Sequence, residues 1–440
     1  MATPEVPASN IDLASALEEA EQRFVDANPL SAAQYRRATG PLPGGNTRSV
    51  LFYRPFPLAL AGGEGCHVHD LDGHDYIDFL SEYTAGLYGH SNPLILAAVH
   101  KALDSGIVLG GQNSMEADLA EAVVTRFPSL DRVRFTNSGT EANMMAIVAA
   151  RAFTGRNKVM VMEGGYHGGV LYFAHGGTPI NAPFDYVLGR YNDAEHCRSL
   201  IRQHASELAC VILEPMQGSG GCVPAGDDFL ACLREETRNA GALLIFDEVM
   251  TSRLGPGGLQ GETGILPDLT TLGKYLGGGM SFGAFGGRAE IMDRFDPRRP
   301  DAWPHAGTFN NNVLTMTAGL VGLTQVFTPD VARRFNAGGD RLRADLNALA
   351  ERHDLPLQFT GRGSMIGVHF RRGEIRNSDD VDAGHNALRP LLHLDLLQQG
   401  IYAAGRGAFL LSLPHGEAEF AALLAAMDEF MQSRRGLIAA

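Results

Sequence analysis

Residues 243–279 read LLIFDEVMTSRLGPGGLQGETGILPDLTTLGKYLGGG, and this stretch decides the fold that the sequence predicts. It opens on an apolar run, residues 243–246, which stops at Asp247, as a strand buried on both faces of a parallel sheet does. A glycine-rich loop leads to a second short strand candidate, residues 269–272, which is soon followed by Lys274. Ligands of open α/β sheets bind beyond the carboxyl ends of the strands, so we expect Asp247 and Lys274 to face one ligand.

An acid and an amine that face one ligand form the arrangement that a pyridoxal phosphate enzyme needs. The Lys274 amine can form a Schiff base with the cofactor, while the Asp247 carboxylate keeps the pyridine nitrogen protonated. A lone aspartate and lysine also fit a buried ion pair and a surface lysine. The choice between these interpretations therefore depends on the rest of the chain.

The length and composition are those of an ordinary globular protein with ample core. The 440 residues are enough for two or three domains, and the 53 glycines suit tight turns and close approach of the backbone to a ligand. The formal net charge is −14 and the sequence has no long basic block, which argues against a nucleic-acid partner or an anionic membrane surface. Because the protein is negatively charged overall, an anionic substrate would have to be bound by arginines close to the site.

Three features of the sequence bear on the compartment. No apolar stretch approaches the ~18 residues of a membrane span. The first residues, MATPEVPASNIDLASALEEAEQ, carry no basic segment followed by an apolar one, so we expect no secretory signal. The five cysteines are odd in number and lack metal-ligand spacing, which predicts reduced thiols, no metal site and a cytoplasmic location.

Short apolar strands alternate with helical patterns between residues 92 and 287. The strand candidates are residues 132–136, 158–162, 208–214, 241–246, 269–272 and 283–287. Helical patterns lie between several of them at 115–127, 141–153 and 228–239, and further ones follow at 312–325 and 331–353. This alternation is typical of βαβ units and predicts an α/β protein with a mainly parallel sheet flanked by helices.

The two ends of the chain predict a smaller α+β domain. Apolar residues recur at helical spacing from Leu13 to Phe24, and residues 65–79 alternate around Asp72-Gly73 as a β-hairpin does. Roughly the last hundred residues read strand, strand, helix, strand, strand, helix. The expected divisions are an N-terminal segment of the small domain at 1–75, a large cofactor-binding domain at 76–328 and the C-terminal small domain at 329–440.

Residues 137–143, NSGTEAN, follow a strand candidate and open a helix. Ser138 or Thr140 can cap that helix, and the free backbone N–H groups and dipole of its N-terminus favour a phosphate. The alternative is a helix cap without a ligand, but Gly139 between two hydroxyl residues directly after a strand supports phosphate binding. A Walker A loop is excluded, because the Gly-Lys-Tyr run at Lys274 lacks the hydroxyl residue and the upstream spacing.

Three more polar segments stand next to strands or helices. In GGYHGG, residues 164–169, Tyr166 could stack on a flat heteroaromatic ring; the alternative is a loop tyrosine packed on its own domain. Glu214 ends a strand candidate at the same sheet edge, and its alternative is a buried carboxylate paired with a backbone donor. Thr308, in GTFNNN, could donate to a phosphate or start a helix. Together, in chain order and at strand ends, these segments supply residues that can bind a phosphate, a tyrosine that can stack on a ring, an aspartate that can bind the ring nitrogen and a lysine amine.

The runs NSGTEAN, GGYHGG, LIFDEVMTSR, LTTLGKYLGGG, GAFGGR and AGTFNNN carry a family likeness. From about residue 24 to residue 414 the chain resembles the class III aminotransferases, which are pyridoxal phosphate enzymes of fold type I. The glutamate-1-semialdehyde aminomutase branch is the closest broad group. Within it, FTNSGTEAN, DEVMTSRL, GKYLGGGMSFGAFGGR and GTFNNNV are most similar to the bacterial β-amino-acid aminotransferases that act on β-phenylalanine.

The resemblance implies roles for the cofactor-binding residues. Lys274 carries the Schiff base to pyridoxal 5′-phosphate, Asp247 binds the pyridine nitrogen and Tyr166 stacks on the ring, with Glu214 at the same edge. The residues expected to hold the phosphate are Ser138, Gly139 and Thr140 of one subunit. Thr308 reaches the phosphate of the neighbouring subunit, which implies a homodimer with shared active sites.

The resemblance also implies how the substrates are held. In PLPGGNTRSVLFY it places Arg48 on the substrate carboxylate, and in GIYAAGRGAFLLSLP it places Arg406 on the carboxylate of the amino acceptor. Tyr83 is a candidate wall of the pocket. An arginine at each place suits bidentate binding of a carboxylate, although each arginine alone also fits a surface salt bridge.

The reaction expected from these residues is the transfer of an amino group from an aromatic β-amino acid to a keto acid such as 2-oxoglutarate or pyruvate. The enzyme alternative is an intramolecular amine shift of the glutamate-1-semialdehyde aminomutase type. Phe309 and the asparagines after it depart from the serine-glycine-asparagine-proline run of the aminomutases, and Arg406 would grip an exchanged keto acid, so both favour the transaminase. The Asp247–Lys274 pair argues against a noncatalytic cofactor-binding protein, and the missing G-x-G-x-x-G argues against a nucleotide-binding module.

Overall fold

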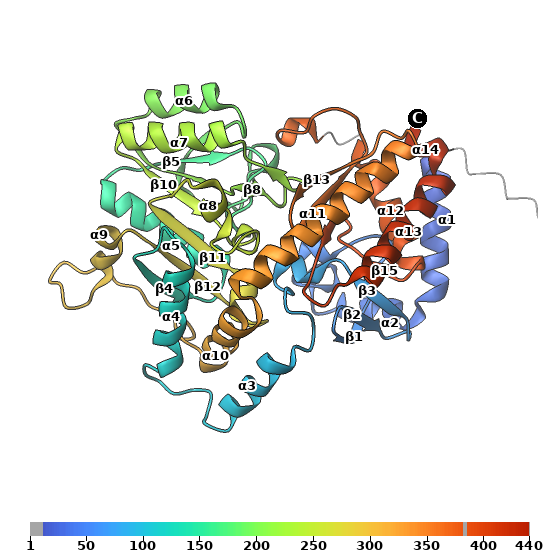
Figure 1. Ribbon diagram of the computed structural model, residues 1–440, viewed down its shortest axis with the longest axis horizontal. Helices are drawn as coiled ribbons and strands as arrows, with labels where there is room; N and C mark the ends of the chain where they lie inside the picture. The colour runs from blue at the N-terminus through green and yellow to red at the C-terminus, as the bar shows by residue number, and fades with distance from the viewer. Residues whose placement is uncertain (1–11, 382–384, 440) are drawn as a thin grey trace, which may run out of the picture.

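The computed structural model describes residues 12–381 and 385–439, and its largest sheet has seven strands (Figure 1). In chain order these strands are β4 Arg132–Thr136, β5 Lys158–Met162, β6 Asp185–Gly189, β7 Leu208–Leu213, β10 Leu243–Asp247, β11 Leu269–Gly273 and β12 Gly283–Gly287. They lie in the order β4-β12-β11-β10-β7-β5-β6. Neighbouring strands are parallel except that β12 runs antiparallel to both β11 and β4. The predicted α/β fold with a mainly parallel sheet is confirmed.

The central strands β7, β10 and β11 are buried on both faces. They are mostly apolar runs, which is the composition that a sheet with helices on both sides requires. The helices that cover them are α5 Gly139–Thr154 on one face and α6 Ala194–Gln203 and α7 Asp227–Ala240 on the other. Ile245 packs among the residues of α5, whereas its neighbours Leu244 and Phe246 pack among those of α6 and α7, because successive side chains of a strand point to opposite faces.

Both ends of the chain form the smaller part of the molecule, where blue and red elements meet (Figure 1). One sheet has the order β1-β2-β3-β15, and a second has the order β13-β14-β16. Their strands are β1 Leu60–Glu64, β2 His67–Asp70, β3 Asp75–Asp78, β13 Gln358–Arg362, β14 Met365–His369, β15 Ile401–Tyr402 and β16 Ala408–Leu410. The predicted hairpin is β2–β3, and β3 pairs in parallel with β15 from the other end of the chain. The predicted α+β character of this part is confirmed, while the domain boundaries at 75/76 and 328/329 stay predictions.

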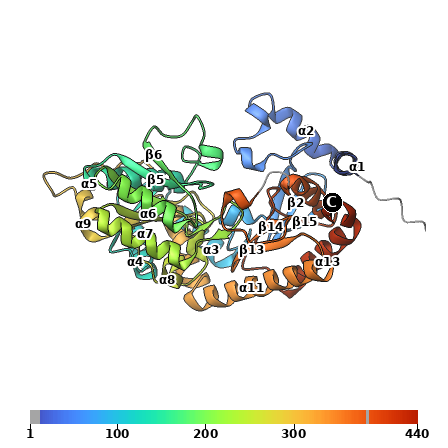
Figure 2. The same ribbon diagram turned by 90° about the horizontal axis from the view of Figure 1, so that it is seen from above.

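Helices surround these two small sheets. They are α1 Leu13–Ala27, α11 Pro329–Arg352, α12 Arg389–Gln398, α13 Glu417–Ser433 and α14 Arg435–Ala439. Helix α1 lies beside the C-terminal elements, and α11 extends from the larger part of the molecule toward α13 (Figures 1 and 2). The other helices and short strands are α2 Pro29–Ala38, α3 Pro93–Leu103, α4 Ser114–Arg126, α8 Gly258–Thr263, α9 Ala289–Met292, α10 Val313–Val321, β8 Met216–Gln217 and β9 Val223–Pro224. No helix within the described ranges is long and apolar enough to cross a membrane.

Among the differences from the sequence prediction are an edge strand and the end of a helix. Strand β6, DYVLG, was not predicted; it lies at the edge of the large sheet and its buried positions alternate with more exposed ones, so the continuous buried run of the central strands is missing. The helix predicted over 312–325 ends at Val321 and continues as a π-helix over Gly322–Val326. A Cβ at Gly322 would fall 2.6 Å from the ring of Tyr88, so this turn packs directly against that tyrosine.

Arg253 is buried completely and joins the two parts of the molecule. Its Nε donates to Oγ of Ser364 at 2.9 Å, Nη1 donates to the carbonyl of Thr84 at 3.3 Å, and Nη2 donates to the carbonyl of Leu411. The guanidinium also lies 5.4 Å from the ring centre of Phe335. Burial lowers the pKa of Arg253 to about 9, which leaves the side chain charged at neutral pH.

Replacing Arg253 with Met should lower the free energy of unfolding by about 3 kcal/mol, because three acceptors in a buried setting lose their donor. The midpoint of urea denaturation measures this change. Arg333→Met is the matched control: Arg333 is exposed and its ion pair among the described residues is with the exposed Asp330, so a change below about 0.5 kcal/mol is expected. Equal shifts in the two variants would contradict the structural role of Arg253.

Candidate active site

Asp247 and Lys274 lie at the same edge of the large sheet. Asp247 is the last residue of β10 and stands opposite Thr271 of β11, and Lys274 follows directly after the end of β11. The reversed strand β12 begins at this edge, where Gly283 pairs with Gly273 and with Thr136 at the end of β4. The ends of three strands therefore converge here, as the stretch 243–279 predicted.

Asp247 is buried and held by three donors. Its Oδ2 accepts from Nδ2 of Asn143 at 2.8 Å and lies 2.7 Å from Nδ1 of His167, while its Oδ1 accepts from the backbone N–H of Val249 at 3.0 Å. Thr271 donates to Oδ1 of Asn143 at 2.6 Å, which orients the amide of that asparagine. These three groups replace the water that the buried carboxylate has lost, and they fix its direction.

Sequence reasoning did not identify Asn143 and His167 as functional residues. Asn143 stands on α5 inside the NSGTEAN run, and His167 stands in the GGYHGG loop after β5. Their presence in these two quoted motifs was the available signal. Which carboxylate they contact depends on how α5 and the loop pack against the end of β10, and that packing is not visible in a motif.

Lys274 is an amine in a site that disfavours its charge. Burial lowers its pKa to about 8; the positive charges of Arg48 and Arg406 act in the same direction, and the negative charges of Glu82 and Asp247 oppose them. Its backbone has a φ of +58°, which is a left-handed conformation that residues with a Cβ rarely adopt. The packing around the end of β11 therefore imposes both the position and the protonation of this side chain.

The start of helix α5 forms a cradle of exposed backbone donors. Ser138 caps the helix by accepting from the N–H of Glu141 at 3.2 Å. Gly139 and Thr140 are the first residues of the helix, so their backbone N–H groups have no carbonyl partner within the helix. A Cβ at Gly139 would fall 2.9 Å from the methyl groups of Val249, and one at Gly168 would fall 2.2 Å from Oγ1 of Thr140. Close packing therefore requires glycine at both positions, 139 and 168, next to the start of α5, where an anion can bind.

Glu214 and Tyr166 line the edge beyond β7 and β5. Oε1 of Glu214 accepts from the N–H of Tyr166 and Oε2 accepts from the N–H of Gly218, both at 3.0 Å. Burial raises the pKa of Glu214 to about 7; His167 acts against this shift and Asp247 adds to it. Glu214 therefore holds the loop that presents Tyr166, whose side chain is half-exposed and meets Tyr172 edge to face at 5.5 Å.

Two arginines stand against one buried tyrosine. The guanidinium carbon of Arg406 lies 4.7 Å from the ring centre of Tyr83, and that of Arg48 lies 6.0 Å from it. Arg48 forms an ion pair with Glu82, whereas Nη1 of Arg406 donates to Oγ of Ser219 at 3.0 Å. Sequence reasoning named Tyr83 and both arginines, but it did not identify Glu82 and Ser219 as their partners.

The segment that carries Tyr83 is held in an unusual backbone conformation. Ser81, Glu82, Tyr83 and Thr84 all have positive φ, between 47° and 79°. The Tyr83 hydroxyl donates to the carbonyl of Val50, two residues after Arg48, at 3.0 Å. Strain of this kind persists only where the surroundings enforce it, and it is concentrated at functional sites.

Thr308 stands apart from the other predicted site residues. It is exposed in the turn that follows Gly307, and the neighbouring Asn310 accepts from Nδ2 of Asn137 at 3.0 Å. Within one subunit the described contacts do not join Thr308 to the residues around Lys274. Its expected contribution to a second subunit stays a prediction.

The donor set at this edge fits pyridoxal phosphate. Three buried polar atoms nearby have no hydrogen-bond partner among residues 12–381 and 385–439: Nε2 of His167, Oε1 of Gln217 and Nε of Arg406. Unpaired polar atoms in a buried setting indicate that a ligand or water completes the site. The start of α5 suits the phosphate of this cofactor, and the Lys274 amine suits its aldehyde. The fixed carboxylate of Asp247 suits the pyridine nitrogen, and the ring of Tyr166 suits the face of the pyridine ring.

Comparison with known proteins identifies the family. The aminotransferase class-III family model matches residues 52–413. A β-phenylalanine transaminase from Variovorax paradoxus is 52% identical over 423 residues, which are 96% of this chain and 97% of that protein. The crystal structure of the β-phenylalanine aminotransferase from Variovorax paradoxus, also 52% identical, superposes with a TM-score of 0.96 over 97% of this chain and 99% of that one.

Two further relatives are more distant. A transaminase solved with pyridoxal phosphate bound is 33% identical and has a TM-score of 0.84, with coverage of 93% of this chain and 98% of its own. A glutamate-1-semialdehyde 2,1-aminomutase from Bacillus licheniformis is 37% identical over 390 residues, which are 84% of this chain and 90% of that protein. With the family match spanning most of the chain, the protein belongs to the class III aminotransferases and is a pyridoxal phosphate-dependent transaminase.

Proposed function

We propose that this transaminase moves the amino group of an aromatic β-amino acid of the β-phenylalanine kind to a keto acid such as 2-oxoglutarate or pyruvate. The observation that carries the proposal is the pair of arginines, Arg48 and Arg406, both beside the ring of Tyr83 and within electrostatic reach of Lys274. The similarity over nearly the whole chain to a β-phenylalanine transaminase supports the choice of donor.

The residues at the sheet edge have distinct tasks toward the cofactor. Ser138, Gly139 and Thr140 bind its phosphate, Asp247 binds the pyridine nitrogen and Lys274 provides the covalent attachment. Bound pyridoxal phosphate supplies an aldehyde that takes up the donor amine and a protonated ring that withdraws electrons from the carbon that loses its proton.

Tyr166 and Glu214 complete the cofactor pocket. Tyr166 packs on the face of the ring, and Glu214 keeps the loop of that tyrosine in place through its backbone N–H. Behind Asp247, Asn143 and His167 hold the carboxylate in a single orientation, so its charge faces the pyridine nitrogen.

Lys274 moves the proton that the reaction requires. Its pKa of about 8 leaves a substantial fraction of the amine neutral near neutral pH, and only the neutral amine can accept a proton from the donor carbon. The same side chain, once protonated, returns the proton within the pocket.

The two arginines allow one pocket to seat two kinds of substrate. A β-amino acid places its carboxylate one carbon farther from the reacting amine than an α-amino acid does, so two carboxylate sites at different distances are needed. Arg48 takes the carboxylate of the β-amino acid, and its ion pair with Glu82 must open to admit that group. Arg406 takes the carboxylate of the keto acid, since its described contacts are Oγ of Ser219 and the Tyr83 ring, neither of them an anion.

The functional unit is a homodimer, and the enzyme is cytoplasmic. Support for the dimer comes from large apolar side chains that one subunit leaves exposed, Val108 at 80% and Phe309 at 59%, the latter next to Thr308. In the dimer Thr308 donates to the phosphate bound by the neighbouring subunit. The five cysteines, all free thiols in the structure, support a reducing compartment.

The holoenzyme should convert β-phenylalanine only when a keto acid is present, with glutamate formed from 2-oxoglutarate or alanine from pyruvate. Lys274→Ala should abolish this turnover and the visible absorbance of lysine-bound cofactor. Chromatographic measurement of both amino acids checks the reaction. Multiple turnovers of an amino substrate without any keto acid would instead establish an intramolecular amine shift of the aminomutase type.

Arg48→Ala and Arg406→Ala should each impair a different half-reaction. Arg406→Ala should raise KM for 2-oxoglutarate by roughly tenfold to a hundredfold with little loss of cofactor affinity, because one charge-assisted pair is lost. Arg48→Ala should slow the β-amino acid half-reaction instead. Single-turnover absorbance changes of the cofactor separate the halves, with Arg37→Ala on the exposed side of α2 as control. An unchanged KM in Arg406→Ala, or an unimpaired donor half-reaction in Arg48→Ala, removes that arginine from its assigned place.

Lys274→Met should stabilise the cofactor-free protein at neutral pH by as much as about 3 kcal/mol. The pKa of Lys274 falls from an ordinary 10.5 to about 8 in the folded protein, so below pH 8 folding buries an unfavourable charge. The gain should shrink as pH rises from 8 toward 10.5, where the amine is neutral in both states. Thermal denaturation at several pH values measures it, with the exposed Lys101→Met as control. A gain that persists undiminished at about pH 10 would show that charge burial is not its cause.

A further inference from the structure

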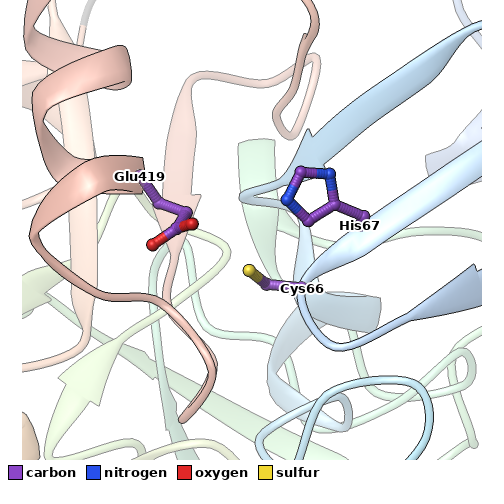
Figure 3. Close-up of side chains that lie close together, drawn as sticks. All are labelled: Cys66, His67 and Glu419. Carbon is purple, nitrogen blue, oxygen red and sulfur yellow. The ribbon is translucent and has the colours of Figure 1, made fainter.

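A thiol, an imidazole and a carboxylate meet in the smaller part of the molecule, among elements other than the strand ends that hold Lys274. One ligand atom each from Cys66, His67 and Glu419 lies within 4.8 Å of the other two (Figure 3). His67 is the first residue of β2 and Cys66 directly precedes it, whereas Glu419 stands in the first turn of α13. These residues come from opposite ends of the chain, so no spacing rule for metal ligands could have found them.

Two of the three side chains are already oriented by hydrogen bonds. Nδ1 of His67 lies 2.9 Å from Oδ2 of Asp75, and its other ring nitrogen turns toward Cys66 and Glu419 (Figure 3). A carboxylate on the far nitrogen is the usual partner of a metal-binding histidine, because it fixes the tautomer and the ring direction. Oε2 of Glu419 accepts from the N–H of Gly416 at 2.7 Å, which leaves the other carboxylate oxygen available.

The backbone holds the two segments together independently of any ligand. Gly65, just before Cys66, accepts from the N–H of His90 at 2.8 Å, and its Cα faces Pro414. The N–H of Leu413 donates to the carbonyl of Leu87 at 2.7 Å, which joins the chain that leads into α13 to the chain that follows the hairpin. The three ligand atoms are therefore brought together by packing and do not require a metal to converge.

The surroundings favour a cation. Cys66 is only 4% exposed, and the negative charges of Glu419, Asp78 and Asp75 act on its thiol. These carboxylates attract a positive ion placed beside the sulfur. His67 and Glu419 are partly exposed, so water has access to the cluster.

We propose that Cys66, His67 and Glu419 bind one Zn²⁺ ion, with water as the fourth ligand and Asp75 as the hydrogen-bonded support of His67. A sulfur, a nitrogen and an oxygen ligand suit zinc, which takes four ligands in tetrahedral geometry. Formation of the Zn–S bond displaces the thiol proton of Cys66 to solvent. The ion ties the N-terminal hairpin to helix α13, and this role is independent of the transaminase reaction.

The test uses the tag-free, reduced holoenzyme after chelator treatment and removal of the chelator. Titration with Co²⁺, followed by difference spectra against the cofactor background, should give a thiolate-to-cobalt charge-transfer band and the visible bands of a tetrahedral site, both saturating at one equivalent. Zn²⁺ should bleach these bands by competition. Zn²⁺ should also raise Tm in a saturable manner, because a ligand of the folded state stabilises it.

Matched variants separate a metal site from general effects. Cys66→Ser should abolish the charge-transfer band, and Cys232→Ser should keep it. Glu419→Gln retains the oxygen that can cap α13 and should weaken Co²⁺ binding, whereas Glu417→Gln in the same turn should not. Asp75→Asn should weaken binding by roughly tenfold to a hundredfold through His67.

Two results would overturn the proposal. One is a wild-type protein that shows no thiolate-to-cobalt band at saturating Co²⁺. The other is a band or a Zn²⁺-dependent rise in Tm that survives in Cys66→Ser and in Glu419→Gln. Because the readouts are spectral and thermal, a failure here leaves the transaminase proposal intact, and a failed transaminase assay leaves the metal site intact.

Discussion

The burial of opposite charges at the carboxyl edge of one parallel sheet is the constraint on which the rest of this structure depends. Asn143, His167 and a backbone N–H replace the water that the buried Asp247 carboxylate has lost, and they fix its direction. Burial and the positive charges of Arg48 and Arg406 lower the pKa of Lys274 to about 8. The same edge therefore holds a hydrogen-bonded carboxylate and an amine whose charge is disfavoured.

The smaller part of the molecule brings Arg406 beside Tyr83. Arg406 follows β15, which pairs with β3 of the N-terminal segment, and Tyr83 follows β3 within a few residues. Arg253 then ties the strained turn after Tyr83 to β14 and β16 through hydrogen bonds to Thr84 and Leu411 and to Ser364. This buried link fixes the turn that carries Tyr83 against the segments around Ser364 and Leu411.

Secondary structure was predicted well where burial imposes a pattern on the sequence. The apolar runs of β7 and β10 and the helical spacing of α11 are direct consequences of packing against other layers. Prediction failed at the edge strand β6 and at the π-helical turn after α10, where Gly322 packs on Tyr88. In both cases the decisive contact is with a partner distant in sequence, and local periodicity carries no record of it.

The sequence by itself determined the α/β architecture and the placement of Asp247 and Lys274 after adjacent strands, because strand ends and helix starts are local features of a chain. The tertiary structure decided which side chains complete the site. Packing between distant segments brings Glu82 to Arg48 and Ser219 to Arg406. It also brings Cys66 close to Glu419. Distance along the chain bears no relation to distance in the fold, so contacts of this kind become visible only when the layers are assembled.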